Sequence, residues 1–340
     1  MIWCSRRSQR VTFLKRRGSK NEDRWDPYPG QGRPVLDYIL KRIAFVIPVL
    51  FGVTLLSFLL LHLAPGDPAD LLAGTEANHQ VIESMRREYG LDRPLYIQYL
   101  VYMNGLLHGN FGRSITTRRP IGPLLKERLM VSLKLALFSI VISLAIGVLT
   151  GVTAATHPNS IFDWVGMVLA LVGASMPIYW FALLLMLFFS VLLPIFPAGG
   201  GTDWCSLVLP AVSLGLSASA LTARMTRASM LEEMRQDYLR TARANGIKER
   251  VIIYHHALKN AMIVIITVVG LQFGYMLGGT VVAETVFAIP GIGLLLLEGI
   301  LGRDYPVVQS SMLMVATLFV FVNLLTDIAY AFFDPRIRYR

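Results

Sequence analysis

The sequence predicts an all-α integral membrane protein with about six transmembrane helices. Hydrophobic residues make up 54% of the chain and charged residues 16%, whereas a soluble domain has roughly 45–50% apolar and 25% charged residues. About six stretches are long and apolar enough to cross a bilayer. Lys and Arg also gather in the segments that these stretches place on one side. Together these observations argue against a soluble chain of two domains.

The start of the chain is rich in Arg, Ser, Gly and Pro and lacks the apolar core of a signal peptide. Residues 1–42 hold 11 Lys and Arg against four Asp and Glu, a net charge of +7. Because basic residues before the first apolar stretch hold that end in the cytoplasm, we predict that residues 1–36 are a disordered cytoplasmic tail. Translation from near Val35 and nucleic-acid binding are alternatives, but no module of basic and aromatic residues follows the tail.

The first predicted transmembrane helix covers residues 37–63, and its 25 residues from Ile39 onward would measure roughly 37 Å. Residues 64–128 are placed outside as a periplasmic helical region, because long loops cross the membrane largely regardless of charge. Within this region, Gln80–Tyr89 and Leu95–Leu107 predict two amphipathic helices that would cap the outer face.

The remaining five predicted helices form a core transmembrane domain, residues 129–333. They are expected to run from about Leu129 to Thr156, Phe162 to Pro194, Leu207 to Met225, Ala261 to Phe287 and Val308 to Phe333. A kink is expected in the third span at Pro177, and the pair Gly147 and Gly151 indicates close helix packing in the second.

The charges of the loops predict the orientation. The segment between the fourth and fifth spans carries eight Lys and Arg, and residues 334–340 carry three. The short loops near Gly199 and Arg303 carry one between them. Because short cytoplasmic loops are enriched in Lys and Arg, both termini are expected in the cytoplasm.

The segment 229–259 between the fourth and fifth spans is more structured than a simple connection. Ser229-Met-Leu-Glu232 has the spacing of a capping box and predicts the start of a helix. Gly246 is placed to end that helix in a left-handed turn, and a second helix is expected from about Lys248. The sequence therefore predicts a helix–Gly–helix hairpin outside the membrane.

Two interpretations of this hairpin stay open on composition alone. Thr241, Ala242 and Ala244 leave little bulk, so a partner backbone would approach closely, and Arg240 and Arg243 offer charge to acidic groups. An ordinary solvated basic loop would have the same composition.

The stretch Asp237-Tyr-Leu-Arg-Thr-Ala-Arg-Ala-Asn-Gly246 resembles the cytoplasmic motif of bacterial binding-protein-dependent ABC permeases. That motif reads Glu-Ala-Ala, three residues, Gly, nine residues, Ile, one residue, Leu-Pro. Here Arg240-Thr-Ala242 and Gly246 occupy its first half, and His256, Leu258 and Lys259 its second. These departures resemble the dipeptide, oligopeptide, nickel and glutathione branch, and the resemblance extends over about residues 37–338. Other stretches that carry it include His62-Leu-Ala-Pro-Gly-Asp-Pro68, Glu284-Thr-Val-Phe-Ala-Ile-Pro-Gly-Ile-Gly293 and Arg303-Asp-Tyr-Pro-Val-Val-Gln309.

The resemblance implies the MetI-like architecture of a type I ABC importer permease. A second permease subunit would complete the pathway, two ATP-binding subunits would hold ATP and Mg, and a periplasmic solute-binding protein would deliver the substrate. This chain would hold no cofactor. The ATPase-coupling residues implied are Asp237, Tyr238, Arg240, Thr241, Ala242, Arg243, Ala244, Gly246 and Leu258.

Polar residues inside the spans are the candidates for pathway or gate positions. Glu284 lies near the outer end of the fifth span, where an interfacial acid at the membrane edge is the alternative. Asn323 and Asp327 lie on one face of the sixth span, where bonding between helices is the alternative.

Competing functions lack their expected motifs. An ATPase-independent secondary transporter or channel would carry polar residues at mid-bilayer, and few are present. No HExxH, Gly-x-Ser-x-Gly or phosphate-binding Gly-rich loop occurs, so we predict no catalytic residue. Without a Cys/His cluster no metal site is predicted, and Cys4 and Cys205 fall on opposite faces, which argues against a disulfide.

Overall fold

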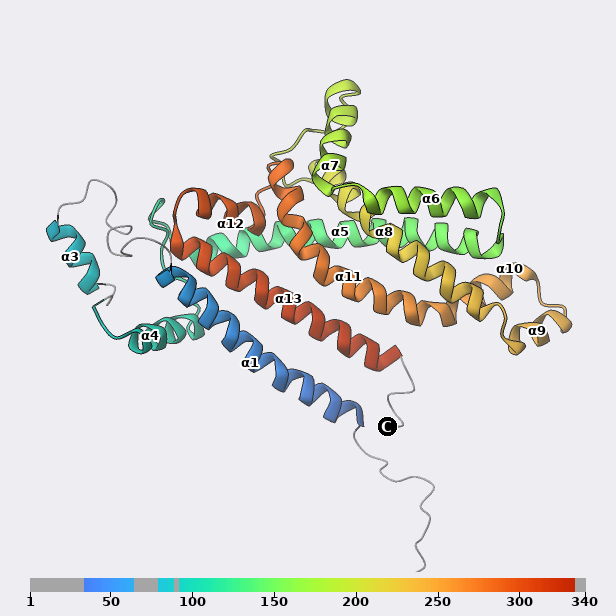
Figure 1. Cartoon of the computed structure of the whole chain (residues 1–340), viewed down its shortest axis with the longest axis horizontal. Helices are drawn as coiled ribbons and strands as arrows, with labels where there is room; N and C mark the ends of the chain where they lie inside the picture. The colour runs from blue at the N-terminus through green and yellow to red at the C-terminus, as the bar shows by residue number, and fades with distance from the viewer. Residues whose placement is uncertain (1–33, 64–78, 89–91, 334–340) are drawn as a thin grey trace, which may run out of the picture. The chain divides into compact units, whose positions relative to one another are not determined.

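The computed structural model describes residues 34–63, 79–88 and 92–333 (Figure 1). The predicted C-terminal segment 334–340 and residues 1–33 of the predicted tail lie outside these described residues. Within the described ranges the regular elements are helices, and one isolated β-bridge joins Arg113 to Pro120. The all-α prediction is therefore confirmed.

Five described helices are long and apolar enough to cross a membrane, and one bent pair would make a sixth span. Up to residue 192 the described helices are α1 (Pro34–Leu63), α3 (His79–Glu88), α4 (Leu95–Leu107), α5 (Ile121–Thr156), α6 (Ile161–Ser175), α7 (Ile178–Met186) and the π-helix η1 (Leu187–Leu192). The second half contains α8 (Trp204–Glu233), α9 (Asp237–Ala244), α10 (Glu249–Val251), the π-helix η2 (Ile252–Ala257), α11 (Leu258–Val286), α12 (Ile292–Leu301) and α13 (Tyr305–Phe333).

The predicted third span is broken rather than kinked. α6 and α7 meet at an angle of 103°. Between them Met176 is extended, with ψ 131°, and Pro177 follows it. A proline disfavours helical geometry in the residue before it and cannot donate a backbone hydrogen bond, so the helix ends here. The position of the bend was predicted correctly, but its size was not.

The predicted second span begins earlier than its apolar composition indicates. α5 starts at Ile121, directly after Pro120, rather than near Leu129. Ile121 and Leu125 are fully buried in a cluster with Leu295 of α12. Because the first turn packs inside the protein, the helix extends past the part that would meet lipid.

The core of the bundle is the crossing of α5 and α8, which α11 also contacts. A Cβ on Gly147 would lie 2.5 Å from Thr222 Cβ, and one on Gly151 would lie 2.5 Å from Thr226 Cβ. No real Cβ contact is that short, so only glycine lets the backbones approach this closely. The close packing predicted for this glycine pair is confirmed.

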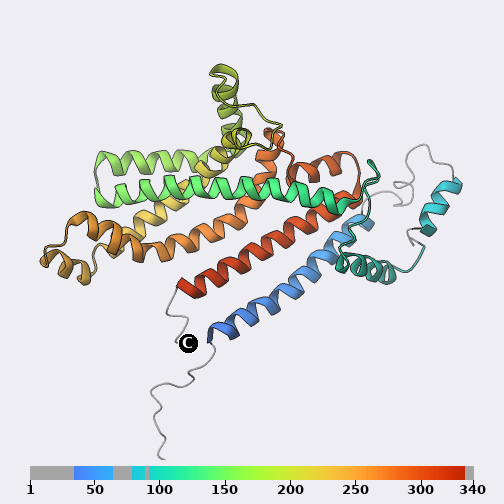
Figure 2. The ribbon, with the colours of Figure 1, turned by 180° about the vertical axis from the view of Figure 1, so that it is seen from behind.

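α1 packs on α13 and on α4, and Figure 2 shows α1 and α13 side by side along their length. α4 has the predicted bounds but is not amphipathic. It contains no charged residue, buries no residue fully, and exposes Leu95, Leu100 and Leu107. The prediction was wrong because its apolar residues outnumber what one helix face can hold.

Candidate functional site

The predicted hairpin begins later than the sequence pattern indicates. α8 runs through Ser229 without a break and ends at Glu233, so the predicted capping box does not start a helix. Ser229 and Met230 are buried, because this turn of α8 still packs against its neighbours. Burial of that face outweighs the local capping preference, and α9 starts instead at Asp237 after a short turn.

The end of α9 has the left-handed turn that the sequence predicted at Gly246. Its φ is +75°, in the left-handed region that glycine adopts without strain. The Gly246 amide donates to the Arg243 carbonyl at 3.0 Å, and the Ile247 amide donates to the Ala242 carbonyl at 3.2 Å. These two bonds form a Schellman motif, which closes the helix. Nothing lies within 4 Å of a Cβ at Gly246, so the backbone angle and not space demands glycine.

The second helix of the hairpin starts where predicted, with Lys248 as its N-cap. It passes through the π-helix η2 before it becomes α11. A π-helical segment inserts an extra residue per turn and is frequent at functional sites. The sequence carried no signal for this irregularity.

One leucine, which the motif comparison did not single out, anchors α9 to the bundle. Leu239 is fully buried and packs in a cluster with Met230 of α8 and with Ile252 and Ala257 of η2. Ala242 and Leu258, both predicted coupling residues, are half-buried against the same cluster. Since Leu239 is the only leucine in an otherwise polar and small-residue helix, its type and position carried the signal.

Polar contacts add a second attachment around Tyr238. Its hydroxyl donates to the Glu233 carboxylate at 2.8 Å and accepts from Asn260 Nδ2 at 2.8 Å. Partial burial and the neighbouring Glu233 raise the pKa of Tyr238, so the phenol stays protonated and able to donate. Tyr238 therefore joins the end of α8 and the start of α11 to α9.

An exposed ion pair spans the Gly246 turn. Arg243 Nη2 lies 2.9 Å from Glu249 Oε1, and Arg243 Nε lies 3.2 Å from Glu249 Oε2. This fork-like pairing ties α9 to α10, and the Glu249 carboxylate raises the pKa of Arg243. Asp237 and Arg240 pair with each other at 3.1 Å and are both exposed.

The outward face of the hairpin combines small and apolar side chains. Thr241 and Ala244 are exposed on α9. Ile247, Val251 and Tyr254 are exposed after the turn. Apolar side chains exposed next to small ones make a surface on which a partner backbone can pack closely.

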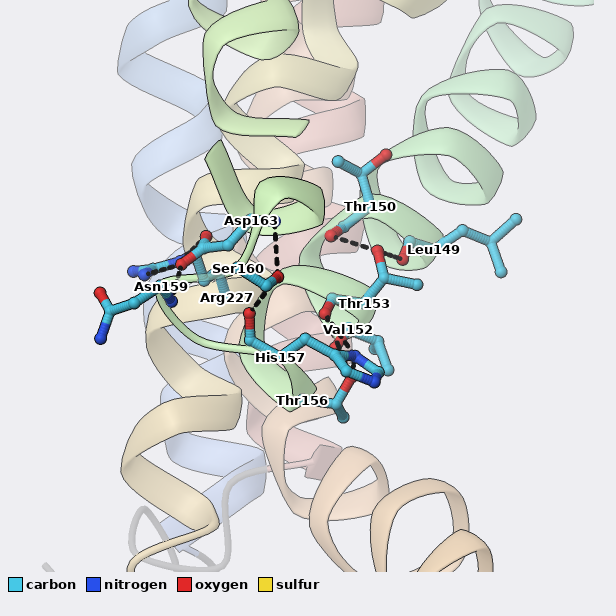
Figure 3. A network of polar contacts seen from close by, with 10 residues as sticks. All are labelled: Leu149, Thr150, Val152, Thr153, Thr156, His157, Asn159, Ser160, Asp163 and Arg227. Carbon is cyan, nitrogen blue, oxygen red and sulfur yellow. Dashed lines mark hydrogen bonds and ion pairs between the residues drawn. The ribbon is translucent and has the colours of Figure 1, made fainter. Parts of the chain in front are cut away.

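Figure 3 shows a buried ion pair that the sequence analysis missed. Arg227 Nε and Nη2 lie 2.6 and 2.7 Å from the two oxygens of Asp163, which is 4% exposed. Asp163 also accepts from the Asn159 amide at 3.0 Å. The pair joins the start of α6 to α8 about two turns before the hairpin. Arg227 was counted only as one basic residue of a loop, and no local pattern pointed to its distant partner.

The Glu284 side chain is fully buried inside the protein, near the C-terminal end of α11. Ser132 Oγ donates to Oε1 at 2.6 Å, and the amides of Gly293 and Leu294 donate to Oε2 at 2.7 and 3.2 Å. A Cβ on Gly291 would collide with the carboxyl group. The turn Pro290-Gly-Ile-Gly293 is therefore a cradle in which Glu284 caps the N-terminus of α12.

A second buried carboxylate, Asp304, was not predicted. It accepts hydrogen bonds from Ser114 Oγ at 2.5 Å and from the amides of Ile115 and Thr116 at 3.2 Å each. It also lies just ahead of α13, where the Val308 amide donates to its carbonyl at 3.0 Å. Asp304 thus fastens the turn after α4 to the α12–α13 connection.

The other two candidates for pathway positions, Asn323 and Asp327, lie on α13, which packs on α11. Asn323 is half-buried in α13, and its Oδ1 would lie 3.1 Å from a Cβ on Gly274 of α11. The backbone of Asp327 continues α13, but its side chain is outside the described residues. No three His, Cys, Asp or Glu side chains gather as a metal site would require within the described ranges.

Two family comparisons cover most of the chain. Residues 147–339 match the sequence model of the binding-protein-dependent transport system inner membrane component, and residues 35–136 match that of the N-terminal part of such membrane components. The chain is 42% identical over 306 residues to the glutathione transport system permease protein GsiC of Escherichia coli (strain K12), covering 90% of this chain and 100% of GsiC. It is 41% identical over 333 residues to the dipeptide transport system permease protein DppB of Alkalihalophilus pseudofirmus, covering 90% of this chain and 100% of DppB.

Proposed function

Because the chain belongs to the family of inner membrane components of binding-protein-dependent transport systems, we propose that it imports peptides or related small solutes when separate ATPase subunits push on α9. The chain is a multi-pass permease subunit of an ABC transporter, in the dipeptide and glutathione branch. It supplies half of the pathway, and a second permease subunit supplies the other half. ATP and Mg are bound by two partner subunits, and a solute-binding protein delivers the substrate.

The substrate class follows from the relatives. GsiC is named for glutathione and DppB for dipeptides, and both substrates are short peptides with a free carboxylate. Dipeptides, longer peptides and glutathione are therefore candidates, and nickel complexes are added only because the hairpin motif also resembles that of nickel permeases. The ligand that the cognate solute-binding protein retains after purification identifies the substrate. Retention of a sugar alone would contradict the peptide proposal and leave the permease assignment intact.

The attachment of α9 is the observation that supports coupling. Its outward face is free to meet a partner, while Leu239 inserts into a cluster that contains residues of α5, α8, η2 and α11. A displacement of α9 would therefore act on three spans at once. The Asp163–Arg227 pair extends the same connection from α8 to α6.

The orientation follows from this role. ATPase subunits work in the cytoplasm, so the α9 hairpin and both chain termini are placed there. The Glu284 cradle and the Asp304 turn are then on the outer side, because they lie at the opposite ends of α11 and α13 (Figure 1). A reporter fused to the C-terminus that is active only in the periplasm would contradict this orientation.

Gly246→Asp tests the coupling proposal. A side chain at φ +75° strains the backbone and an added negative charge alters the partner-facing turn, so ATP-driven uptake in proteoliposomes should fall at least about tenfold, which corresponds to ~1.4 kcal/mol of coupling energy. Asn245→Asp is the matched control, because it adds the same charge at φ −79°. Normal uptake by the Gly246→Asp importer, with normal membrane insertion, would contradict coupling through this hairpin.

The alternative of an ATPase-independent secondary transporter or channel has a direct test. Proteoliposomes that hold the permease pair without ATPase subunits should show no uptake above empty liposomes. Full uptake under a proton or sodium gradient, without ATP, would favour the alternative. The same vesicles with ATPase subunits and ATP serve as the control for correct insertion.

A further inference from the structure

α4 is an unusual segment for a region expected to stand in the periplasm. Its 13 residues, Leu95 to Leu107, contain no charged side chain. At ~1.5 Å per residue the helix is roughly 20 Å long, which is too short to cross a hydrocarbon layer of about 30 Å. A charge-free helix of this length is suited to lie within the apolar layer of a membrane without spanning it.

The contacts of α4 with α1 set its depth. The Tyr99 hydroxyl lies 2.8 Å from Thr54 Oγ1, and the Tyr99 ring lies edge-on to Phe51 and Phe58 at 5.9 and 5.4 Å between centroids. All three partners fall inside Arg42–Leu59, the apolar window that makes α1 a candidate span. Figures 1 and 2 both show α4 beside the C-terminal half of α1. α4 therefore packs on the membrane-spanning part of α1 and not beyond its end.

The rest of α4 exposes mostly apolar side chains, with Asn104 exposed among them. The large apolar side chains there are each more than half exposed: Leu95, Tyr96, Leu100, Val101 and Leu107. This face continues onto α1, where Phe51 and Leu56 are also more than half exposed. A surface of this kind at this depth would be costly in water.

Lipid fits this face better than another protein chain. Helix pairs inside membranes favour small residues where their backbones meet, as Gly147 and Gly151 show at the crossing of α5 and α8. The exposed face of α4 carries Leu, Val and Tyr side chains instead. Tyrosines are typical of the boundary between hydrocarbon and headgroups, and three of them lie on α4.

We propose that α4 is embedded in the membrane, with the face formed by Leu95, Tyr96, Leu100, Val101 and Leu107 against lipid acyl chains. The helix enters one leaflet beside α1 and returns to the same side. The assignment of this leaflet as the outer one rests on the proposed orientation of α1. The lipid contact itself does not depend on that orientation. Embedded in this way, α4 holds the external region at the membrane surface and braces α1, which also packs on α13.

Spin labels on α4 test the proposal in the whole importer. In a background with Cys4→Ser and Cys205→Ser, single cysteines are introduced as Leu100→Cys or Val101→Cys and labelled in phospholipid nanodiscs. Phe45→Cys on the exposed face of α1 is the lipid control, and Arg119→Cys in the exposed turn is the water control. The readout is collision of the label with oxygen, which dissolves in lipid, against a water-soluble nickel chelate.

The two α4 labels should match the α1 control, with an oxygen-to-nickel ratio several-fold above that of Arg119→Cys. Collision with the nickel chelate at the level of the water control would overturn the proposal. Protection from both reagents would also overturn it, because the face would then be covered by the second permease subunit. Two label positions guard against a local disturbance by either one, and unchanged ATP-driven uptake shows that the labelled importer is folded.

Discussion

At the end of the bundle that is proposed to be the outer one, two buried carboxyl groups hold the loops, whereas at the hairpin end α9 is held by one buried leucine and by exposed polar contacts. Glu284 accepts hydrogen bonds from Ser132 of α5 and from two amides at the start of α12, and Asp304 accepts three from residues 114–116. Leu239 makes non-directional contacts, and the Arg243–Glu249 pair is open to solvent. Hydrogen bonds to a buried charge have one good geometry, but apolar contacts and exposed ion pairs tolerate small shifts.

This contrast gives the two ends different mechanical roles. The connections between α11, α12 and α13 at this end are fixed, so the loops proposed to face a solute-binding protein keep their shape. The hairpin end can shift as a unit without leaving a buried polar group unpaired. A push from an ATPase would therefore enter at the compliant end and be transmitted toward the fixed one. The π-helix η2 lies between α10 and α11 and is the irregular segment nearest to the point of entry.

The largest expected effect, Glu284→Ala, tests whether the outer end is fixed by its carboxylates. The substitution leaves the Gly293 and Leu294 amides without their acceptor inside the protein. We expect a loss of about 3–5 kcal/mol in the free energy of unfolding, seen as a lower temperature of half-unfolding in purified importer. Glu298→Ala is the control, because Glu298 is half-exposed and lies 3.9 Å from Arg128. Equal stability of the two variants would contradict the role assigned to the buried carboxylate.

Leu239→Ala tests the other side of the comparison and should separate stability from coupling. Removing the buried side chain costs about 2–5 kcal/mol in the packing of α9, but the spans keep their own contacts. Uptake should be lost while the spans remain folded, and trypsin should cut faster at Arg240 and Arg243. Leu301→Ala, at an exposed position of α12, is the matched control. If uptake persisted in Leu239→Ala, the anchor would not be the link between α9 and the spans.

Asp304→Asn sharpens the description of the outer end without creating a cavity. The amide group puts a donor in the place of one carboxylate oxygen, either Oδ1, which accepts from Ile115, or Oδ2, which accepts from Ser114 and Thr116. We expect the free energy of local unfolding to fall by about 1–3 kcal/mol, and only in the turn of residues 113–120. Hydrogen exchange should rise at the Ile115 and Thr116 amides and stay unchanged in α9. A rise throughout the bundle would mean that the turn supports the whole fold.

The comparison also explains which features the sequence could predict. Local chemistry predicted the helix end at Gly246, the position but not the size of the bend at Pro177, and the close packing at Gly147, because each depends on residues near in the chain or on glycine itself. Ser132, which donates to Glu284, is 152 residues away, and Ser114, which donates to Asp304, is 190 residues away, so no local pattern indicated these two contacts. The capping pattern at Ser229 was misleading, because burial of α8 outweighs a preference of about 1 kcal/mol.

The smallest expected effect concerns the exposed pair of Arg243 and Glu249, where the two ends should differ most. Solvent screens this pair, so Arg243→Glu alone should lower the free energy of unfolding by no more than about 1 kcal/mol, apart from the local repulsion between the two like charges. Adding Glu249→Arg reverses both charges and should restore protection of the Ile247 amide from hydrogen exchange. High salt should reduce the difference in protection of the Ile247 amide between the single and double variants. If the single variant instead destabilised the importer as strongly as Glu284→Ala, the hairpin would be locked by charge, and the ends would not differ in the way their contacts indicate.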